Sequence, residues 1–199
     1  HAPVDQKELL FHATLRDGRP ADRQIRSVVR EALPGFAANV TPLISETRPC
    51  LPPVPYGFRS FNRQWIIPDP RVITQPNAEL WESRSEQQVF LTAMMRSSPS
   101  SGPALSFTGL IPDLDHYKGS FGGRVFPLWR DAAATVSNVL PALLDHLARA
   151  YNIPVGAEDV MAYIAAVAAH PDYSARFQAD LSTPGLRIPL TADANTFTA

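Results

Sequence analysis

The sequence contains one cysteine, two lysines and no long hydrophobic run. Cys50 alone cannot form an internal disulfide, which is typical of proteins in a reducing compartment. No apolar stretch approaches the ~20 residues that a membrane-spanning helix requires, and no secretory signal is recognisable. We therefore expect a cytoplasmic protein without a membrane partner.

The basic side chains are almost all arginine, because Lys7 and Lys118 are the only lysines. The formal net charge of −1 argues against a free-standing, non-specific DNA binder, since such proteins are strongly basic. Residues 1–130 carry 15 basic and 12 acidic side chains, or +3, whereas residues 131–199 carry 3 and 7, or −4. An anionic partner is therefore expected to meet the first part of the chain.

Aromatic side chains alternate with arginines between residues 56 and 71. Such a run predicts a strand that buries its rings on one side and presents guanidinium groups on the other, or a strand followed by a turn at residues 68–70. Guanidinium matches phosphate oxygens and the guanine edge, so the pattern indicates either nucleic-acid contact or an ordinary strand with a solvated face. The residues are Tyr56, Phe58, Phe61 and Trp65, with Arg59, Arg63 and Arg71.

Four passages of the sequence resemble one known family. YGFRSFNRQWIIPDPRVI, which starts at Tyr56, resembles the segment that follows the methyltransferase core in type ISP restriction-modification enzymes. Three later passages resemble the same family in the same order, up to Asp193, whereas residues 1–55 match less distinctly. They are SGPALSFTGLIPDLDHYKG with FGGRVFPLW, then AEDVMAYIAAVAAHPDYSARFQADL, then TPGLRIPLTAD.

The resemblance implies the target-recognition, or specificity, region of a single-chain phage-defence enzyme. Such enzymes combine N6-adenine DNA methylation with ATP-dependent translocation and cleavage. The implied partners are double-stranded DNA and the methyltransferase and translocase domains of the parent chain. The parent would use S-adenosylmethionine, ATP and Mg²⁺. Because the sequence starts at His1 without a methionine, we expect a fragment of a larger polypeptide.

Six side chains are the candidate DNA contacts, because arginine, lysine and amide groups suit phosphates and base edges. The aromatic side chains between residues 56 and 65 are assigned mainly to packing. The candidates are Arg59, Arg63, Gln64, Arg71, Lys118 and Arg124.

Catalytic motifs are missing from the sequence. It has no Asn/Asp-Pro-Pro-Tyr/Phe motif for adenine methylation, no Walker A sequence, no Gly-x-Ser-x-Gly elbow and no zinc-ligand spacing. The cluster of Asp113, Asp115 and His116 is compatible with a metal site, but these residue types are also common in turns. We expect no catalytic residue, metal or cofactor within this chain.

The hydrophobic periodicity predicts an α+β fold in three parts. Residues 1–55 would form a connector from the methyltransferase core, with a helix that ends at Pro34 followed by a proline-rich linker. Residues 56–130 would hold a small mixed or antiparallel sheet that carries recognition, and residues 131–199 a helical scaffold.

Local signals place the individual elements. Strands are predicted near residues 88–94, 104–111 and 122–129, and the last two are read as a hairpin with Lys118 at its tip. Helices are predicted near 78–84, with Asn77 as its cap, and at 138–151, with Asn138 as its cap. Further helices are predicted over 157–170 and from Pro171 to Leu181, followed by a short strand or extended tail at 186–190.

A second function remains open at this point. The aromatic-arginine segment could dock on the methyltransferase core as a structural or protein-interaction module, with its arginines paired to carboxylates there. The low net charge favours this alternative. Salt dependence of DNA affinity would discriminate the two, because a DNA surface releases counterions on binding.

Overall fold

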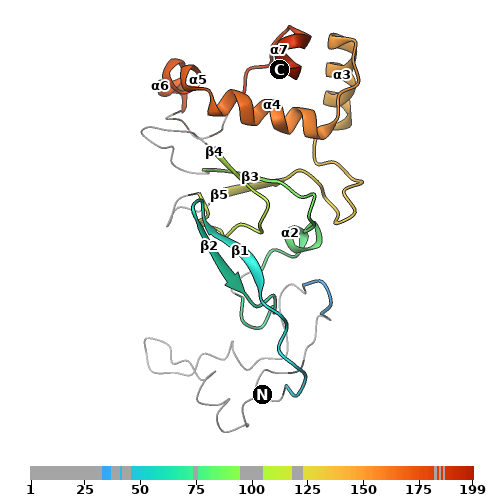
Figure 1. The fold of residues 1–199 in the computed structure, drawn as a ribbon, viewed down its shortest axis with the longest axis vertical. Helices are drawn as coiled ribbons and strands as arrows, with labels where there is room; N and C mark the ends of the chain where they lie inside the picture. The colour runs from blue at the N-terminus through green and yellow to red at the C-terminus, as the bar shows by residue number, and fades with distance from the viewer. Residues whose placement is uncertain are drawn as a thin grey trace. The chain divides into compact units, whose positions relative to one another are not determined.

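The computed structural model describes residues 33–36, 41, 46–73, 76–94, 105–117, 123–181, 183, 185 and 187–199 (Figure 1). The predicted connector helix before residue 33 and the candidate contact Lys118 lie outside the described residues. The chain divides into two compact units. One comprises His1–Pro55 and Trp65–Glu82, and the other Tyr56–Gln64 and Ser83–Ala199.

The second unit contains a three-stranded antiparallel sheet. Its central strand is β3 (Phe90–Met94), which pairs with β4 (Leu105–Thr108) on one side and β5 (Gly123–Pro127) on the other. All of β3 is buried, because it has a neighbouring strand on each side and an apolar sequence. Three predicted strands are thus confirmed in shortened form. The expectation that the second and third of them form a hairpin with each other is wrong, because β3 lies between them.

Helix α4 (Ala157–Ala169) packs on one face of this sheet. Met161, Ile164 and Ala168 of the helix contact side chains of β3 and β4. Those side chains alternate along β3, so that every second residue faces the helix. Together they form one hydrophobic core, and its sheet residues are Leu91, Ala93, Leu105 and Phe107.

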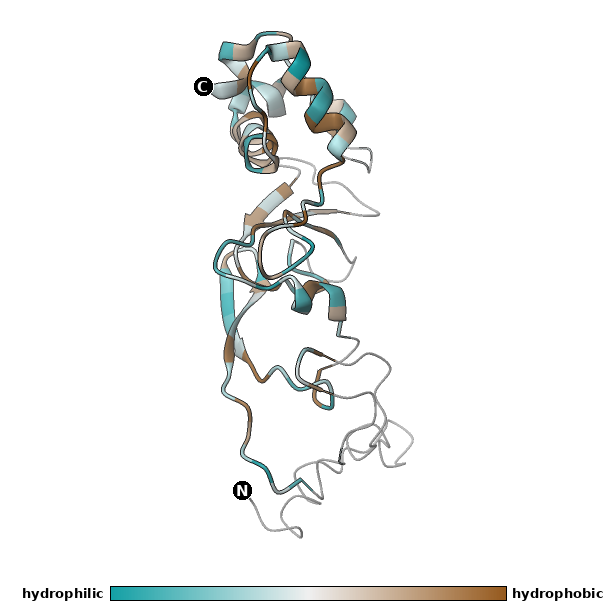
Figure 2. Ribbon diagram, turned by 90° about the vertical axis from the view of Figure 1, so that its right-hand side faces the viewer, coloured by the Kyte–Doolittle hydropathy of each residue, from teal (hydrophilic) through white to brown (hydrophobic). Residues whose placement is uncertain are grey.

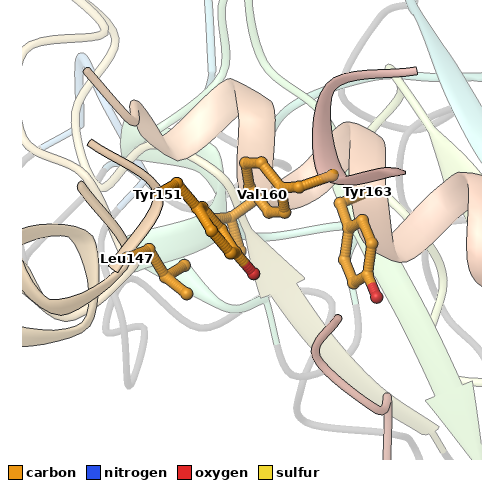
Figure 3. Close-up of a cluster of buried hydrophobic side chains, with 5 residues drawn as sticks. Leu147, Tyr151, Val160 and Tyr163 are labelled. Atoms are coloured by element: carbon orange, nitrogen blue, oxygen red, sulfur yellow. The ribbon is translucent and has the colours of Figure 1, made fainter. Parts of the chain in front are cut away.

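A second core lies between α4, α3 (Pro141–Tyr151) and α7 (Ala194–Thr198), and Figure 3 shows its side chains. The ring of Phe197 lies 4.8 Å from that of Tyr151 and 5.0 Å from that of Tyr163, measured between ring centroids. The predicted helices are confirmed here, but α7 was not predicted. Asp193 caps α7 by accepting hydrogen bonds from two backbone N–H groups.

The helix starts follow local chemistry. The predicted cap Asn138 is wrong, because α3 begins at Pro141 with Leu140 as its N-cap, and the Asn138 backbone donates to Leu128 instead. Proline suits the first helical position because its missing N–H would be unpaired there. His170 caps α5 (Pro171–Arg176), which α6 (Gln178–Leu181) follows. Residues 187–190 form no strand.

In the first unit, the short helix predicted near residues 78–84 is α2 (Ala78–Glu82). Asn77 Oδ1 accepts a hydrogen bond from the Leu80 N–H at 3.2 Å, which confirms the predicted cap. Trp81 is buried. The strands and helices of both units together confirm the α+β class.

Candidate nucleic-acid interface

The aromatic-arginine segment folds as a two-stranded antiparallel hairpin of β1 (Val54–Arg59) and β2 (Asn62–Ile66). The chain reverses at Ser60 and Phe61. This turn could not be predicted from glycine or proline, because neither of its residues is of that type. The turn predicted around residues 68–70 also forms, where the Asp69 carbonyl accepts from the Val72 N–H at 3.0 Å. In Figure 2, part of β2 has the colour of hydrophilic residues.

Strand β1 is hydrogen-bonded to the loop that follows β4. The Gly57 N–H donates to the Ile111 carbonyl at 2.9 Å, and the Asp113 N–H donates to the Gly57 carbonyl at 2.9 Å. His116 Nδ1 lies 2.7 Å from the same Gly57 carbonyl, so this nitrogen carries the proton and donates it. The hairpin is therefore anchored through β1, and β2 is its outer strand.

The turn of the hairpin is held from the same loop. The backbone N–H of Ser60 donates to the His116 carbonyl at 2.8 Å, and the Ser60 hydroxyl donates to that carbonyl at 3.0 Å. Two donors on one buried acceptor fix the position of the turn relative to the sheet-containing unit. The next residue, Phe61, is thus presented from a fixed backbone.

Arg59 is held in place by Asp113. Its Nη1 lies 2.8 Å from Asp113 Oδ1, and its guanidinium stacks over the Phe58 ring at 4.0 Å. The Tyr56 hydroxyl donates to Asp113 Oδ2 at 3.1 Å. Burial and the Asp113 charge raise the pKa of Tyr56 well above its ordinary value. One third of the Arg59 side chain remains exposed, so it reaches solvent from a fixed position.

Strand β2 is exposed over Asn62–Trp65. Arg63 and Gln64 are therefore accessible, and Gln64 Nε2 donates to Asn62 Oδ1 at 2.9 Å. Within the part of the chain that the structure describes, no carboxylate pairs with Arg63. We call Phe61, Asn62, Arg63 and Gln64 the tip surface. Sequence reasoning missed Asn62, although its two-residue spacing from Gln64 places both side chains on one strand face.

The assignment of the hairpin aromatics to packing is only half right. Tyr56 and Phe58 are partly buried on the anchored strand. Phe61 is 104 % exposed and Trp65 is 70 % exposed, so for these two the assignment to packing is wrong. The physical reason is the reversal at Ser60–Phe61, which moves both rings to the turn and the outer strand.

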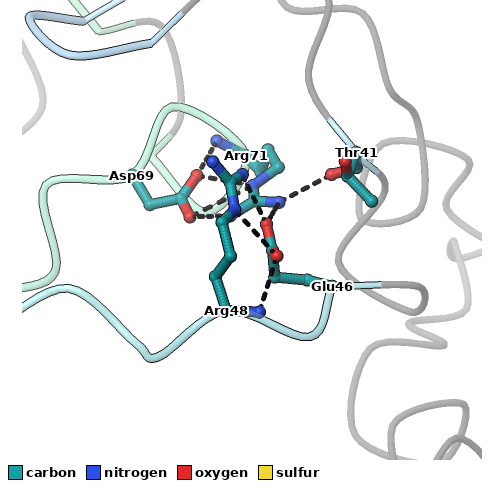
Figure 4. A network of polar contacts seen from close by, with 5 residues as sticks. All are labelled: Thr41, Glu46, Arg48, Asp69 and Arg71. Carbon is teal, nitrogen blue, oxygen red and sulfur yellow. Dashed lines mark hydrogen bonds and ion pairs between the residues drawn. The ribbon is translucent and has the colours of Figure 1, made fainter.

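Arg71 occupies a buried ionic cluster in the first unit (Figure 4). Its guanidinium pairs with Asp69 and with Glu46, at 2.9 Å to the latter, and donates to the Thr41 carbonyl at 2.6 Å. Hydrogen bonds from Arg48 and then from Arg71 hold the pKa of Glu46 well below its ordinary value. Arg71 is 8 % exposed, so its donors are used within the fold and it is not carried into the proposed DNA surface.

Arg124 lies on β5 opposite Ala93. Paired residues of neighbouring strands point to the same face, and Ala93 faces α4. Arg124 accordingly lines a cavity of about 420 Å³ together with Phe126, Met161 and Ile164. The structure therefore places the exposed Arg124 on the face of the sheet against which α4 packs.

The residues of the Asp-x-Asp-His cluster serve the hairpin anchor. Asp113 accepts from Tyr56 and Arg59, and His116 donates to Gly57. Among the residues that the structure describes, no group of three or more His, Cys, Asp or Glu side chains is placed to hold a metal ion. None of the described helices is long and apolar enough to cross a membrane.

The fold defines the class of protein as an α+β domain that presents an anchored, polar hairpin. The model of the type ISP C-terminal specificity domain matches residues 28–199. Since this match spans most of the chain, the protein belongs to that family, and the chain is a target-recognition region of the type ISP restriction-modification class. Searches of curated proteins and of solved structures returned no match.

Proposed function

We propose that this domain binds double-stranded DNA and reads the target sequence with the β1–β2 hairpin. The observation that carries the proposal is the contrast between the two strands: β1 and the turn after it are anchored by Gly57 and Ser60, whereas β2 is exposed over Asn62–Trp65. The major groove of B-DNA admits a two-stranded ribbon. A ribbon that is fixed along one strand can present the other to base edges at little entropic cost.

The tip surface carries the side chains that base recognition requires. Arg63 can donate two hydrogen bonds to the O6 and N7 atoms of guanine. Asn62 and Gln64 already share one hydrogen bond, and the outer carbonyl and amide groups of this pair match the N6 and N7 atoms of adenine. Because successive side chains of a strand point to opposite faces, Arg63 provides the guanine contact from one face of β2 and the pair of Asn62 and Gln64 provides the adenine contact from the other.

Arg59 is proposed to contact a phosphate, whereas Arg63 is proposed to read a base. Its pair with Asp113 already satisfies part of its charge, so it is less suited than Arg63 to the readout of a base. A guanidinium held at a fixed place with one third of its surface exposed is suited to a phosphate contact that sets the register of the hairpin. Arg124, from its place beside α4, is not part of this contact.

The full-length protein is proposed to methylate adenine and to translocate on and cleave DNA, as the family implies. S-adenosylmethionine, ATP and Mg²⁺ would be bound by the methyltransferase and translocase domains of that protein. This domain would supply the sequence selectivity for those activities and act in the cytoplasm, as part of a defence against phage.

The test is selection of a randomised duplex library by the full-length protein, followed by affinity measurements on the recovered motif between ~50 and ~200 mM salt. Arg63→Ala should weaken binding by about 1 to 3 kcal/mol and relax selectivity at one base position. Arg149→Ala, which removes an exposed arginine from α3, is the matched control and should leave selectivity unchanged. Unchanged selectivity of the Arg63 variant, with loss of association with the methyltransferase part, would favour the docking alternative.

A further inference from the structure

Phe61 is the apex residue of the hairpin and the most exposed large apolar side chain of the described structure, at 104 %. It belongs to neither hydrophobic core, and none of the aromatic pairs found among the described residues includes it. Burial of an apolar ring is favourable by roughly 25 cal/mol per Å². A ring left fully in water therefore contributes nothing to the fold and is available to a partner.

The backbone beneath this ring is fixed. Ser60, the residue before Phe61, is tied to the His116 carbonyl by both its N–H and its hydroxyl. His116 is 3 % exposed, so the acceptor belongs to a buried residue. The ring consequently projects from a rigid support, which lowers the entropy lost when it is inserted into a partner.

The neighbours of the ring indicate the chemistry of that partner. Asn62, Arg63 and Gln64 follow it directly and are all exposed. A protein-docking patch has an apolar centre around its aromatic anchor, whereas here the next three residues offer hydrogen bonds. Trp65, at 70 % exposure, is the second exposed ring of the hairpin, but these three polar residues separate it from Phe61 in the sequence. A flat ring directly followed by base-reading groups fits a base pair, whose face is flat and whose edges are polar.

We infer that Phe61 is a wedge that stacks on a base pair and opens the base stack next to the sequence that Arg63 reads. This inference rests on the proposed function, since the ring reaches the stack only when the hairpin lies in the groove. Apolar wedges that enter a base step unstack it and kink the duplex. The favourable ring–base stacking offsets the lost base–base stacking. Phe61 would thereby act as a positioning residue that selects easily unstacked steps at the target.

The experiment uses the full-length protein and two duplexes that carry the recovered motif. One is intact and contains 2-aminopurine at the step next to the motif, and the other has a single abasic site there. The abasic duplex has already lost the stacking that a wedge must break. The wild-type protein is expected to raise the 2-aminopurine fluorescence several-fold and to bind the abasic duplex roughly 10-fold more tightly than the intact one.

Phe61→Ala should keep its selectivity for the bases of the motif and lose only the preference for an easily unstacked step beside it. It should not raise the fluorescence, and it should bind both duplexes equally. Phe61→Tyr, which keeps a stacking ring, should restore both signals. Leu140→Ala removes an apolar side chain that is 72 % exposed beside α3 and should behave as the wild type. These three variants separate stacking from the general loss of a surface side chain.

The outcomes separate this inference from the function on which it rests. If the wild type selects a motif but Phe61→Ala retains the fluorescence change and the preference for the abasic duplex, the wedge is overturned while DNA reading stands. If the wild type binds no duplex at low salt, both are overturned. If Phe61→Ala abolishes selectivity as Arg63→Ala does, Phe61 is a direct reader of the motif and the wedge is again overturned.

Discussion

His116 Nδ1 donates a hydrogen bond to the Gly57 carbonyl at 2.7 Å, and the imidazole lies so close to Gly57 that a Cβ atom there would be 3.1 Å from both Cε1 and Nδ1. The glycine is thus required for close approach of the ring to the strand. Because Gly57 also pairs with Ile111 and Asp113 through its backbone, this contact is the centre of the anchor that holds β1.

Gly57→Ala should therefore destabilise the hairpin. The added methyl group would press on a histidine that is 3 % exposed and cannot move into solvent, and overpacking of this kind costs about 1 to 3 kcal/mol. Urea unfolding should show a free energy of unfolding that is lower by this amount. Amide hydrogen exchange should show faster exchange at residues 57 and 60, whose N–H groups bond to the anchoring loop.

Gly109→Ala is the matched control. A Cβ atom at residue 109 would lie 3.6 Å from the Gln88 carbonyl, which is an ordinary van der Waals contact. This variant should unfold within about 0.5 kcal/mol of the wild type. Equal effects of the two substitutions would mean that His116 moves freely and does not anchor β1.

The contribution of Tyr56 to the stability of the anchored hairpin should be lost at alkaline pH. Burial, and then the charge and hydrogen bond of Asp113, raise the pKa of the Tyr56 phenol above its ordinary value of 10.0. The folded state therefore holds the phenol proton more tightly than the unfolded state. The resulting stability is fully present below pH 10 and is lost as the pH rises above it.

Tyr56→Phe should lower the stability at pH 8 by about 1 kcal/mol, because it removes the hydrogen bond to Asp113. It should also show a shallower decline above pH 10 than the wild type does. Part of the decline should remain, since burial raises the pKa of Tyr117, Tyr151 and Tyr173 in the same direction. Parallel curves for the variant and the wild type between pH 8 and 11.5 would refute this assignment.

Substitution of two arginines of the same segment should have very different effects on stability. Arg71→Ala leaves Asp69, which is 5 % exposed, without its charge partner, and should cost about 3 kcal/mol of stability. Arg63→Ala removes an exposed side chain and should change stability by less than about 0.5 kcal/mol. Urea unfolding measures both. A destabilised Arg63 variant would show that Arg63 is structural and would weaken the proposal for DNA reading.

The strands and helices could be largely predicted because their signals are local. The apolar run that predicts β3 spans only a few consecutive residues, and so does the alternating pattern that predicts β5. The pairing order could not be predicted, because it depends on contacts between segments that are far apart: β3 separates β4 from β5. The short helix α7 was missed although Asp193, a good N-cap residue, stands before it.

The candidate site was harder to predict for the same reason. Arg63 and Arg71 look alike in the sequence, but Arg71 meets Glu46, which lies 25 residues earlier. Only Asp69, two residues before Arg71, was a local signal for that cluster. Phe61 looked like a packing residue because aromatic side chains are common in strands. The tight turn that exposes Phe61 contains no glycine or proline, so it has no signal in the sequence.

The ionic cluster of the first unit should make its stability sensitive to acid. Hydrogen bonds from Arg48 and Arg71 hold the pKa of Glu46 well below its ordinary value of 4.5. Because the folded-state pKa is depressed, the contribution of Glu46 is present above about pH 4.5 and is lost as the pH falls below it. The pKa values of Asp131 and Asp193 are also lowered, because Thr135 donates a hydrogen bond to Asp131 and Thr196 donates one to Asp193. Both carboxylates therefore add to the loss of stability in acid.

Glu46→Gln keeps the shape of the side chain and removes its charge. At pH 6 the variant should be less stable than the wild type, because Arg71 then has one carboxylate partner in place of two. The difference should shrink as the pH falls from 5 toward 2, since the wild-type carboxylate becomes protonated as well. Urea midpoints at pH 6, 4 and 3 measure this convergence. A difference that stays constant over this range would mean that the charge of Glu46 does not stabilise the cluster, and that its hydrogen bonds alone hold Arg71.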